Sequence, residues 1–368
     1  MKFTSSKEAL LPCLTLANSI VQKKQTLAIL SNLLLDVNQD SLRIVSTDLE
    51  LEFETRINVE VGEQGSVTVP ARKLFDIVRN HPDGSTLELT LKDNHVQVRS
   101  NSRRFSLNTM SVEDFPTIRG GQFDLRLNLT GSELKDLIES TSFSIAQQDV
   151  RYYLNGLYMD IGENTLRAVA TDGHRMAVSE SAAINVEGNC KGVIVPRKCI
   201  LELNRLLADP DQEVLIQLNK EFIEFKVGEN RLISRLIDGS FPDYQKVIPK
   251  DCDKKLIIDR QILRDAINRV SVLSNENYKS VEFDIRPSLL KLKTHNTDQD
   301  EAEEELSAEF SGKDEMILGF NCSYFLDVLG VIKSEKVQIE LKDASSGCLI
   351  EAYDDKKQSQ YVIMPMRL

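Results

Sequence analysis

The sequence contains no tryptophan, and only 6% of its 368 residues are aromatic. Its core must therefore be built mainly from aliphatic side chains. No apolar run approaches the roughly 18 residues that a membrane-spanning helix needs. The N-terminus lacks the long apolar segment and small-residue cleavage site of a secretory signal. The six cysteines form no C-x-x-C pair, so neither a zinc site nor a disulfide framework is predicted. Scattered thiols fit a reducing cytoplasm, which is the location we expect.

Motifs of catalysis are also missing. The chain has no P-loop, no H-E-x-x-H and no G-x-S-x-G sequence, and its four histidines are isolated from one another. It likewise carries no zinc finger and no aromatic RNA-binding signature that would read bases. We therefore expect a protein without catalytic residues, without a cofactor and without a bound metal.

The net charge of −12 restricts the ways in which the protein could contact nucleic acid. Proteins that simply adhere to DNA phosphates are usually basic. An acidic chain can still bind DNA if it concentrates positive charge on one face.

The chain repeats one pattern three times. A short alternating strand, a polar cap and an amphipathic helix begin at Lys2, Leu125 and Lys255. Each copy continues with strands, a second helix and more strands, at a spacing of about 125 residues, which is the size of a domain. The shared order of elements favours a repeat over chance similarity, and predicts domains at 1–123, 124–252 and 253–368. Pro12 predicts that the first helix is bent or begins late.

Charge differs between the predicted helices and the rest of the chain. The helical segments together carry +5, which leaves −17 for the strands and loops. These segments are 7–24, 71–79, 132–143, 196–206, 259–271 and 323–336. One interpretation is that the helices share a surface that faces a polyanion, through loose contacts suited to sliding. The other is that they are ordinary solvated helices, and charge alone does not decide between them.

Several strings identify a family resemblance. DVRYYLNG at 149–156, TDGHR at 171–175, GSFPDY at 239–244 and YVIMPMRL at 361–368 resemble the bacterial DNA polymerase III beta subunit, together with LSNE and EAEEE. The resemblance covers the whole chain. It implies an α+β fold of three clamp domains, each with two inner helices and two outer antiparallel sheets.

The same resemblance implies a function. Two subunits would join head to tail in a ring that encircles duplex DNA without reading its sequence. The ring would tether the DNA polymerase III alpha subunit, the clamp loader and other proteins with clamp-binding motifs. No membrane contact is implied.

The resemblance also places a peptide-binding pocket between the second and third domains. Its methionines can repack around varied apolar anchors, and Gly173 allows close backbone approach. The alternative is a plain hairpin turn at TDGH and a core strand at VIMPM, which the combined strings disfavour. Lys246 stands where relatives can carry arginine, so a bidentate contact there is in doubt. The pocket residues are Leu154, Thr171, Gly173, His174, Arg175, Met176, Pro242, Lys246, Val247, Ser346, Val362, Met364, Pro365, Met366, Arg367 and Leu368.

A second set of residues matches positions that contact DNA in the family. The tyrosines could stack on nucleic acid, or one of them could belong to the core while the basic residues are merely solvated. The set is Lys24, Arg72, Lys73, Gln148, Arg151, Tyr152 and Tyr153.

A third set would form the contact between subunits. Arg103, Arg104, Phe105 and Leu107 of the first domain would face Val272, Leu273, Glu301, Glu303 and Glu304 of the third. An apolar centre with charges of opposite sign around it is a common interface design. The alternatives for EAEEE are a solvated acidic loop or a metal site, although the segment lacks the central glycine of a calcium loop.

Two other functions stay open on the sequence. The acidic segment 298–305 could hold Mg²⁺ in an enzyme that acts on nucleic acid, or the repeats could form an adaptor that binds only proteins.

Overall fold

The computed structural model describes residues 1–22, 27–182, 184–188, 192–275, 278–353 and 359–367. They fall into two compact units, which are described separately. The first unit comprises Met1–Lys135, Asn185–Cys190 and Lys198–Leu236, and the second comprises Asp136–Ile184, Lys191–Arg197 and Ile237–Leu368. No helix in the described part of the chain is long and apolar enough to cross a membrane.

The first unit contains two antiparallel sheets. A five-stranded sheet has the order β5-β1-β7-β8-β9, and a nine-stranded sheet has the order β14-β10-β16-β17-β18-β4-β3-β2-β6. The strands are β1 Lys2–Ser6, β2 Asn32–Asn38, β3 Ser41–Thr47, β4 Leu51–Asn58, β5 Glu60–Glu63, β6 Gly65–Pro70, β7 Thr86–Lys92, β8 His95–Ser100, β9 Arg103–Asn108, β10 Leu125–Thr130, β14 Asn185–Gly188, β16 Glu213–Leu218, β17 Phe222–Val227 and β18 Asn230–Arg235.

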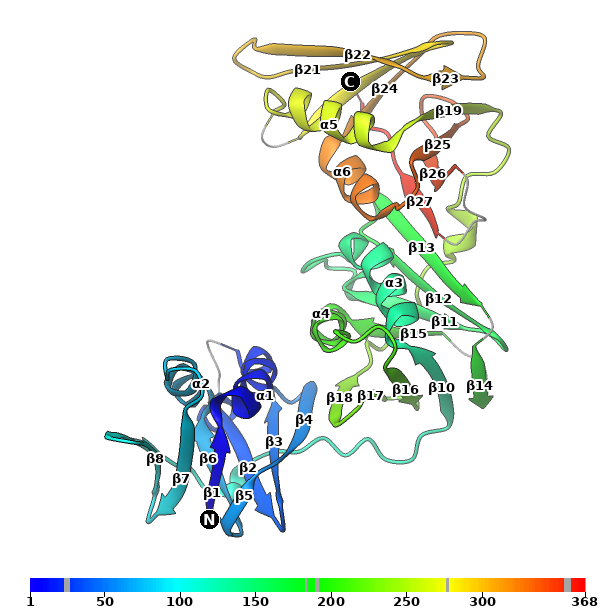
Figure 1. Ribbon diagram of the computed structural model, residues 1–368. Helices are drawn as coiled ribbons and strands as arrows, with labels where there is room; N and C mark the ends of the chain where they lie inside the picture. Colours follow the sequence, from blue (N-terminus) through cyan, green and yellow to red (C-terminus); the bar gives the residue numbers. More distant parts are fainter. Residues whose placement is uncertain (23–26, 183, 189–191, 276–277, 354–358, 368) are drawn as a thin grey trace. The chain divides into compact units, whose positions relative to one another are not determined.

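The second unit repeats this plan with a nine-stranded and a four-stranded sheet. Their orders are β15-β11-β12-β13-β27-β26-β25-β19-β23 and β22-β21-β20-β24. The strands are β11 Gly156–Ile161, β12 Thr165–Thr171, β13 Arg175–Ala182, β15 Gly192–Pro196, β19 Lys254–Asp259, β20 Ser280–Arg286, β21 Leu289–His295, β22 Glu301–Ser307, β23 Glu309–Phe310, β24 Met316–Asn321, β25 Lys336–Leu341, β26 Cys348–Ala352 and β27 Ser359–Ile363. In Figure 1, β13 and β27 run side by side through the centre of this unit.

Six helices of eight residues or more occur in the described chain: α1 Lys7–Ile20, α2 Ala71–Arg79, α3 Gly131–Thr141, α4 Arg197–Leu206, α5 Arg260–Ser271 and α6 Cys322–Val331. Polar residues start three of them, because a side-chain oxygen can accept a free N–H of the first turn. Ser6 accepts from the amide of Ala9, Asp259 from that of Ile262, and Asn321 from that of Ser323.

The helices bury apolar residues at helical spacing. In α1, which packs against α2, the buried side chains include Leu10, Leu14 and Ala17. In α5, which packs against α6, they include Leu263 and Ile267. The cores are aliphatic with phenylalanines, as the absence of tryptophan requires.

The structure decides three points that the sequence analysis had predicted or left open. The first helix does not begin late, since it starts at Lys7 and continues through Pro12 to Ile20. The last helix ends at Val331 and not at 336. The segment EAEEE is not an acidic loop: it lies in β22, which pairs with β21 along its whole length.

The strand registers reveal the repeat in detail. Strand β4 of the first third pairs with β18 of the second, and β13 of the second pairs with β27 of the third. Both pairings end in the same bond: the amide of Arg235 donates to the carbonyl of Glu50 at 2.8 Å, and that of Met364 donates to His174 at 2.9 Å. We call residues equivalent when they hold the same register position in two copies.

The turn before each of these strands is also repeated. The amide of Leu49 donates to Thr47 Oγ1, and the amide of Gly173 donates to Thr171 Oγ1, both at 3.1 Å. The two central residues adopt the left-handed conformation, with φ of +80° at Leu49 and +89° at Gly173. Leucine is strained there by roughly 1–2 kcal/mol, whereas glycine is not.

We expect Leu49→Gly to stabilise the protein by about 0.5–1 kcal/mol, because relief of the strain exceeds the added freedom of the unfolded glycine. Gly173→Leu should destabilise it by about 1–2 kcal/mol. Scanning calorimetry of both variants at equal protein concentration measures the two shifts. Shifts of the melting temperature that are equal and of the same sign in both variants would contradict the strain at Leu49.

Candidate functional site

The turn at residues 171–175 is a tightly bonded platform at the tip of the β12–β13 hairpin. Thr171 Oγ1 donates to the carbonyl of Arg175 at 2.7 Å. Asp172 Oδ1 accepts from the amides of His174 at 2.9 Å and Arg175 at 3.0 Å. Side chains of Asp and Thr favour such turns by bonding their own backbone two or three residues on. Gly173 and His174 are exposed on this platform.

Arg175 ties the platform to α6. Its guanidinium donates to Asp172 Oδ2 at 3.1 Å, to Asp327 Oδ2 at 2.5 Å and to the carbonyl of Phe143 at 2.7 Å. It also lies 4.4 Å from the ring centroid of Tyr324, within cation–π range. With only 12% of its side chain exposed, it positions the turn more than it offers a free charge.

Arg151 reaches the same turn. It pairs with Asp149 at 2.8 Å and donates to the carbonyl of Asp172 at 3.1 Å. The hydrogen bond from Arg151 lowers the pKa of the Asp149 carboxyl to about 2. A Cβ at Gly173 would lie 2.8 Å from the Arg151 guanidinium, so glycine is what allows this close approach. The sequence assigned Arg151 to DNA alone, and the structure places it also beside the predicted pocket.

Apolar side chains of β13, β27 and the 241–248 segment meet next to the platform. Met176, Val362 and Tyr244 belong to one buried cluster, and the Tyr244 hydroxyl donates to Asp160 at 2.8 Å. Val247 and Met364 are 47% and 40% exposed at its margin. Exposed apolar side chains over a buried apolar floor suit an extended peptide with apolar anchors.

The other predicted pocket residues take varied positions in the second unit. Leu154 is buried, and Pro242 is exposed. Lys246 forms an exposed pair with Asp243 at 2.9 Å. Ser346 Oγ donates to Asp343 Oδ2 at 2.9 Å. Hydrogen bonds from Ser345 and Ser346 lower the pKa of the Asp343 carboxyl.

Residues 365–367 lie beside β24, through an isolated bridge between Met366 and Gly319. Pro365 and Met366 are half-buried, Arg367 is exposed, and the amide of Met366 donates to the carbonyl of Gly319 at 2.7 Å. Leu368 lies outside the described residues. A pocket of about 310 Å³ adjoins the cluster at Val178, Tyr244 and Gln360.

The predicted DNA-binding residues are distributed over both units. Arg72 and Lys73 are exposed on α2 of the first unit. Gln148 and Tyr152 are exposed in the second unit, and Tyr153 is half-buried with its ring edge-on to Tyr152 at 5.9 Å. Val150 between them is 95% exposed. Lys24 lies outside the described residues.

Seven of the nine predicted interface residues lie on two sheet-edge strands, and Val272 and Leu273 directly follow α5. Strand β9, with Arg103, Arg104 and Phe105 exposed, ends the five-stranded sheet, and β22 ends the four-stranded sheet. Leu107 is buried in its own unit. Val272 is 78% exposed and Leu273 is half-buried.

The acidic residues of β22 have partners within the second unit. Glu303 pairs with Lys291 at 2.9 Å, and Glu304 pairs with Arg269 at 2.5 Å, while Glu301 is exposed. Among the described residues, no three His, Cys, Asp or Glu side chains are grouped so that they could hold a metal ion. The geometry of β22 therefore does not favour the Mg²⁺ hypothesis.

Comparison with known proteins accounts for the whole chain. Three family models match it: the DNA polymerase III beta subunit N-terminal domain at residues 1–119, the central domain at 128–243 and the C-terminal domain at 245–367. The chain belongs to the DNA polymerase III beta subunit family. Its three clamp domains, built from helices and antiparallel sheets, match the known structures of sliding clamps.

Individual relatives in this family are similar over their full length. The beta sliding clamp of Pseudomonas putida is 46% identical and that of Escherichia coli 43%, with complete coverage of both chains. A sliding clamp of Pseudomonas aeruginosa bound to griselimycin is 44% identical, with a TM-score of 0.96 and complete coverage. As a DNA polymerase III beta subunit, the chain is a non-catalytic processivity factor that acts as a sliding clamp on DNA.

Sequence reasoning missed Tyr324, Asp327 and Phe143, which hold Arg175 in place. The only sequence signal for these contacts was the pair of aromatic residues at the start of the helix in CSYFLD. Nothing in that string indicated a contact between Asp327 and Arg175, which lie 152 positions apart.

Proposed function

We propose that two copies of this chain join head to tail through β9 of one and β22 of the other, and so close a ring around duplex DNA. The support is the repeat itself. Two of the three equivalent strand pairs, β4–β18 and β13–β27, are made within the chain. The third copy of β4 and β13 is β22, and the third copy of β18 and β27 is β9. Both strands are sheet edges. Edges of this kind readily pair with another chain.

The registers predict which residues would be opposite each other. Val178 pairs with Gln360 and Ser179 with Ser359 in the β13–β27 contact. The equivalent positions at the proposed interface are Glu303 opposite Arg104 and Glu304 opposite Arg103. Directly opposed charges of opposite sign stabilise antiparallel strands.

For the peptide site, we propose the surface formed by the 171–176 turn, Val247 and the 362–367 segment. Its support is the meeting of exposed Val247 and Met364 over the buried Met176 and Val362. Partner proteins, including the polymerase, would insert apolar side chains there. The ring would work in the cytoplasm, where the replicative polymerase acts.

For DNA contact, we propose Arg72, Lys73, Gln148, Tyr152 and Tyr153, with Arg151 shared between DNA and the peptide site. Few and exposed cations suit sequence-independent contact that permits sliding. The domain boundaries at 123 and 252 fit this function, since each domain would then bring one edge strand to the next.

The ring makes a topological prediction. Protein loaded onto nicked circular plasmid by a clamp loader should stay bound through gel filtration in about 0.5 M salt, a concentration that weakens phosphate contacts strongly. Linearisation by one restriction cut should then release most of it. Equal retention on circular and linear DNA would contradict encirclement.

A further inference from the structure

Asp327 lies on α6 and reaches a residue of another domain. It belongs to the C-terminal family domain, matched at 245–367, whereas its partner Arg175 belongs to the central domain, matched at 128–243. Asp327 Oδ2 accepts from the guanidinium of Arg175 at 2.5 Å. The side chain of Asp327 is 44% exposed and that of Arg175 only 12%. A guanidinium buried to this extent depends on its partners in the protein, because little water can replace them.

Arg175 connects this contact to the turn at 171–175. Its Nε donates to Asp172 Oδ2 at 3.1 Å, while Asp172 Oδ1 accepts from the amides of His174 at 2.9 Å and Arg175 at 3.0 Å. The carbonyl of His174 in turn accepts from the amide of Met364 at 2.9 Å. The position of one guanidinium therefore orients two parts of the proposed peptide site, the exposed turn and Met364 at the apolar margin.

The equivalent turn of the first copy is also bound by a helix. Asp48 precedes the left-handed residue of that turn, as Asp172 does in the second copy. Its Oδ1 accepts from two backbone amides of the turn, at 3.1 and 2.8 Å. Its Oδ2 accepts from Lys198 of α4 at 2.5 Å. In both copies, one oxygen of the aspartate shapes the turn and the other is bound by a cation.

The strand registers show that α4 and α6 occupy the same place in two copies. The residues just before these helices, Pro196 and Asn321, are equivalent, because each pairs with the first residue of β11 or β20. Counting two residues on makes Lys198 equivalent to Ser323. A serine has no charge and a short side chain, so it cannot bind the turn aspartate as the lysine does.

The cation therefore comes from a different element in each copy. In the first copy it is Lys198 on the helix, and the strand position equivalent to Arg175 carries Leu51. In the second copy it is Arg175 on the strand, and the helix supplies the carboxylate of Asp327. The connection between turn and helix is present in both copies, although different residues make it. This repetition indicates that the connection orients the turn and is not an incidental ion pair.

Another ion pair joins the same two family domains through residues outside the turn. Lys333, which follows α6, pairs with Asp136 of α3 at 2.8 Å, and the two side chains are 80% and 59% exposed. Exposed pairs of this kind contribute little to stability. Asp136→Asn removes one ion pair and one negative charge, as Asp327→Asn does, but it leaves the contacts of Arg175 intact. It is therefore a matched control.

We propose that Asp327 is a positioning residue of the peptide site, which fixes the 171–175 turn through Arg175 and so sets the affinity for a bound peptide. The proposal rests on the proposed function of the surface formed by this turn, Val247 and the 362–367 segment. Asp327 acts through Arg175 and not through contact with the peptide. The third domain thereby controls a turn that belongs to the second.

The first test is the affinity of the full-length protein for a labelled short peptide derived from the polymerase III alpha subunit, measured by fluorescence anisotropy. We expect Asp327→Asn to bind about 10-fold more weakly or worse, because the neutral amide leaves the buried guanidinium without its counter-charge. Asp327→Glu restores the charge and should bind within about 3-fold of the wild type.

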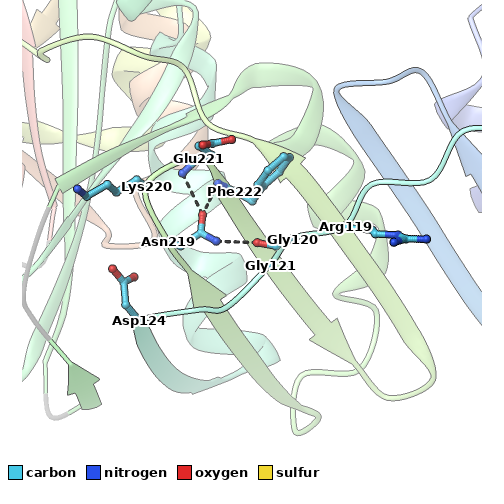
Figure 2. A pocket seen from close by; sticks show the side chains of 8 residues that line it. All are labelled: Arg119, Gly120, Gly121, Asp124, Asn219, Lys220, Glu221 and Phe222. Atoms are coloured by element: carbon cyan, nitrogen blue, oxygen red, sulfur yellow. Dashed lines mark hydrogen bonds between the residues drawn. The ribbon is translucent and has the colours of Figure 1, made fainter.

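Two controls remove the same charge elsewhere. Asp136→Asn should bind the peptide within about 2-fold of the wild type, because its ion pair is exposed. Glu221→Gln changes an exposed residue that lines a pocket of about 410 Å³ in the first unit (Figure 2). It should also stay within about 2-fold, as surface substitutions away from a site do.

The second test is hydrogen exchange of the turn, followed by mass spectrometry without peptide. A fragment that covers 171–176 should exchange faster in Asp327→Asn than in the wild type, and at the wild-type rate in Asp136→Asn, because only the first change releases Arg175. In an Arg175→Gln protein, where the turn is already released, the added Asp327→Asn change should leave this exchange unaltered.

The proposal is overturned if Asp327→Asn binds the peptide as the wild type does, or if it and Asp136→Asn lose affinity equally. It is also overturned if the exchange of the turn is unchanged, or if exchange becomes faster throughout the third domain, since Asp327 would then support only the fold. A wild type that binds no peptide overturns the proposed peptide site instead, and the exchange of the turn then decides whether Asp327 holds it.

Discussion

Replacing Arg103 and Arg104 together with glutamate should convert the dimer to monomers at micromolar concentration. In the proposed register these arginines lie opposite Glu304 and Glu303. Each directly opposed pair of unlike charges stabilises by about 0.2–1 kcal/mol, and like charges destabilise by similar amounts. Reversing two pairs therefore weakens each contact by about 1–4 kcal/mol, or roughly 5-fold to 1,000-fold. A closed dimer has two such contacts, so both are weakened together.

Ion pairs within the second unit hold Glu303 and Glu304 in place. Glu303 is held by Lys291 and Glu304 by Arg269, so the carboxylates are ordered on β22 before any partner arrives. Sedimentation velocity across a dilution series measures the dimer constant, and retention on nicked plasmid measures the consequence. The control is Arg119→Glu with Lys220→Glu, which makes the same change of net charge at exposed residues outside β8, β9 and β22. A dimer constant that moves equally in both variants would show that net charge, and not the β9–β22 register, decides assembly.

The helices and strands could be predicted well from the sequence because the same order of elements occurs three times. The equivalent helices α1, α3 and α5 each follow a short alternating strand, and the last residue of that strand caps α1 and α5. Pro12 misled because proline is tolerated in α1 despite the lost backbone donor, in a helix whose inner face is anchored by Leu10 and Leu14. EAEEE misled because its charge suggested a loop, whereas alternate glutamates can lie on the exposed face of a strand beside lysines.

The candidate site could be predicted from the sequence only in part. TDGHR is a local turn, and its hydrogen bonds follow from Asp172 and Thr171. The partners of Arg175 and the contact of Arg151 with the Asp172 carbonyl depend on packing between distant segments. The equivalence of Leu49 and Gly173 became visible only through strand register, since one position carries a strained leucine and the other a glycine.

Val247→Asp is expected to weaken binding of a short polymerase-derived peptide by about 30-fold to 1,000-fold. Val247 is 47% exposed beside the cluster of Met176, Tyr244 and Val362, where an apolar anchor would cover it. Covering a carboxylate without a partner costs several kcal/mol, so roughly 2–4 kcal/mol of binding energy is lost. Surface plasmon resonance with an immobilised peptide measures the effect.

The matched control for this prediction is Ile317→Asp on β24, because Ile317 is 46% exposed in the same unit and lies outside the proposed site. A second variant, deletion of Met364–Leu368, removes the bonds to His174 and Gly319 and should also abolish peptide binding. Both site variants should keep the dimer and its retention on circular DNA, because β9 and β22 are untouched. Loss of the dimer on deletion would show that the tail supports the fold of the third domain. If Val247→Asp binds the peptide as tightly as the wild type does, the apolar side chain of the peptide does not cover Val247, and the proposed position of the peptide site is wrong.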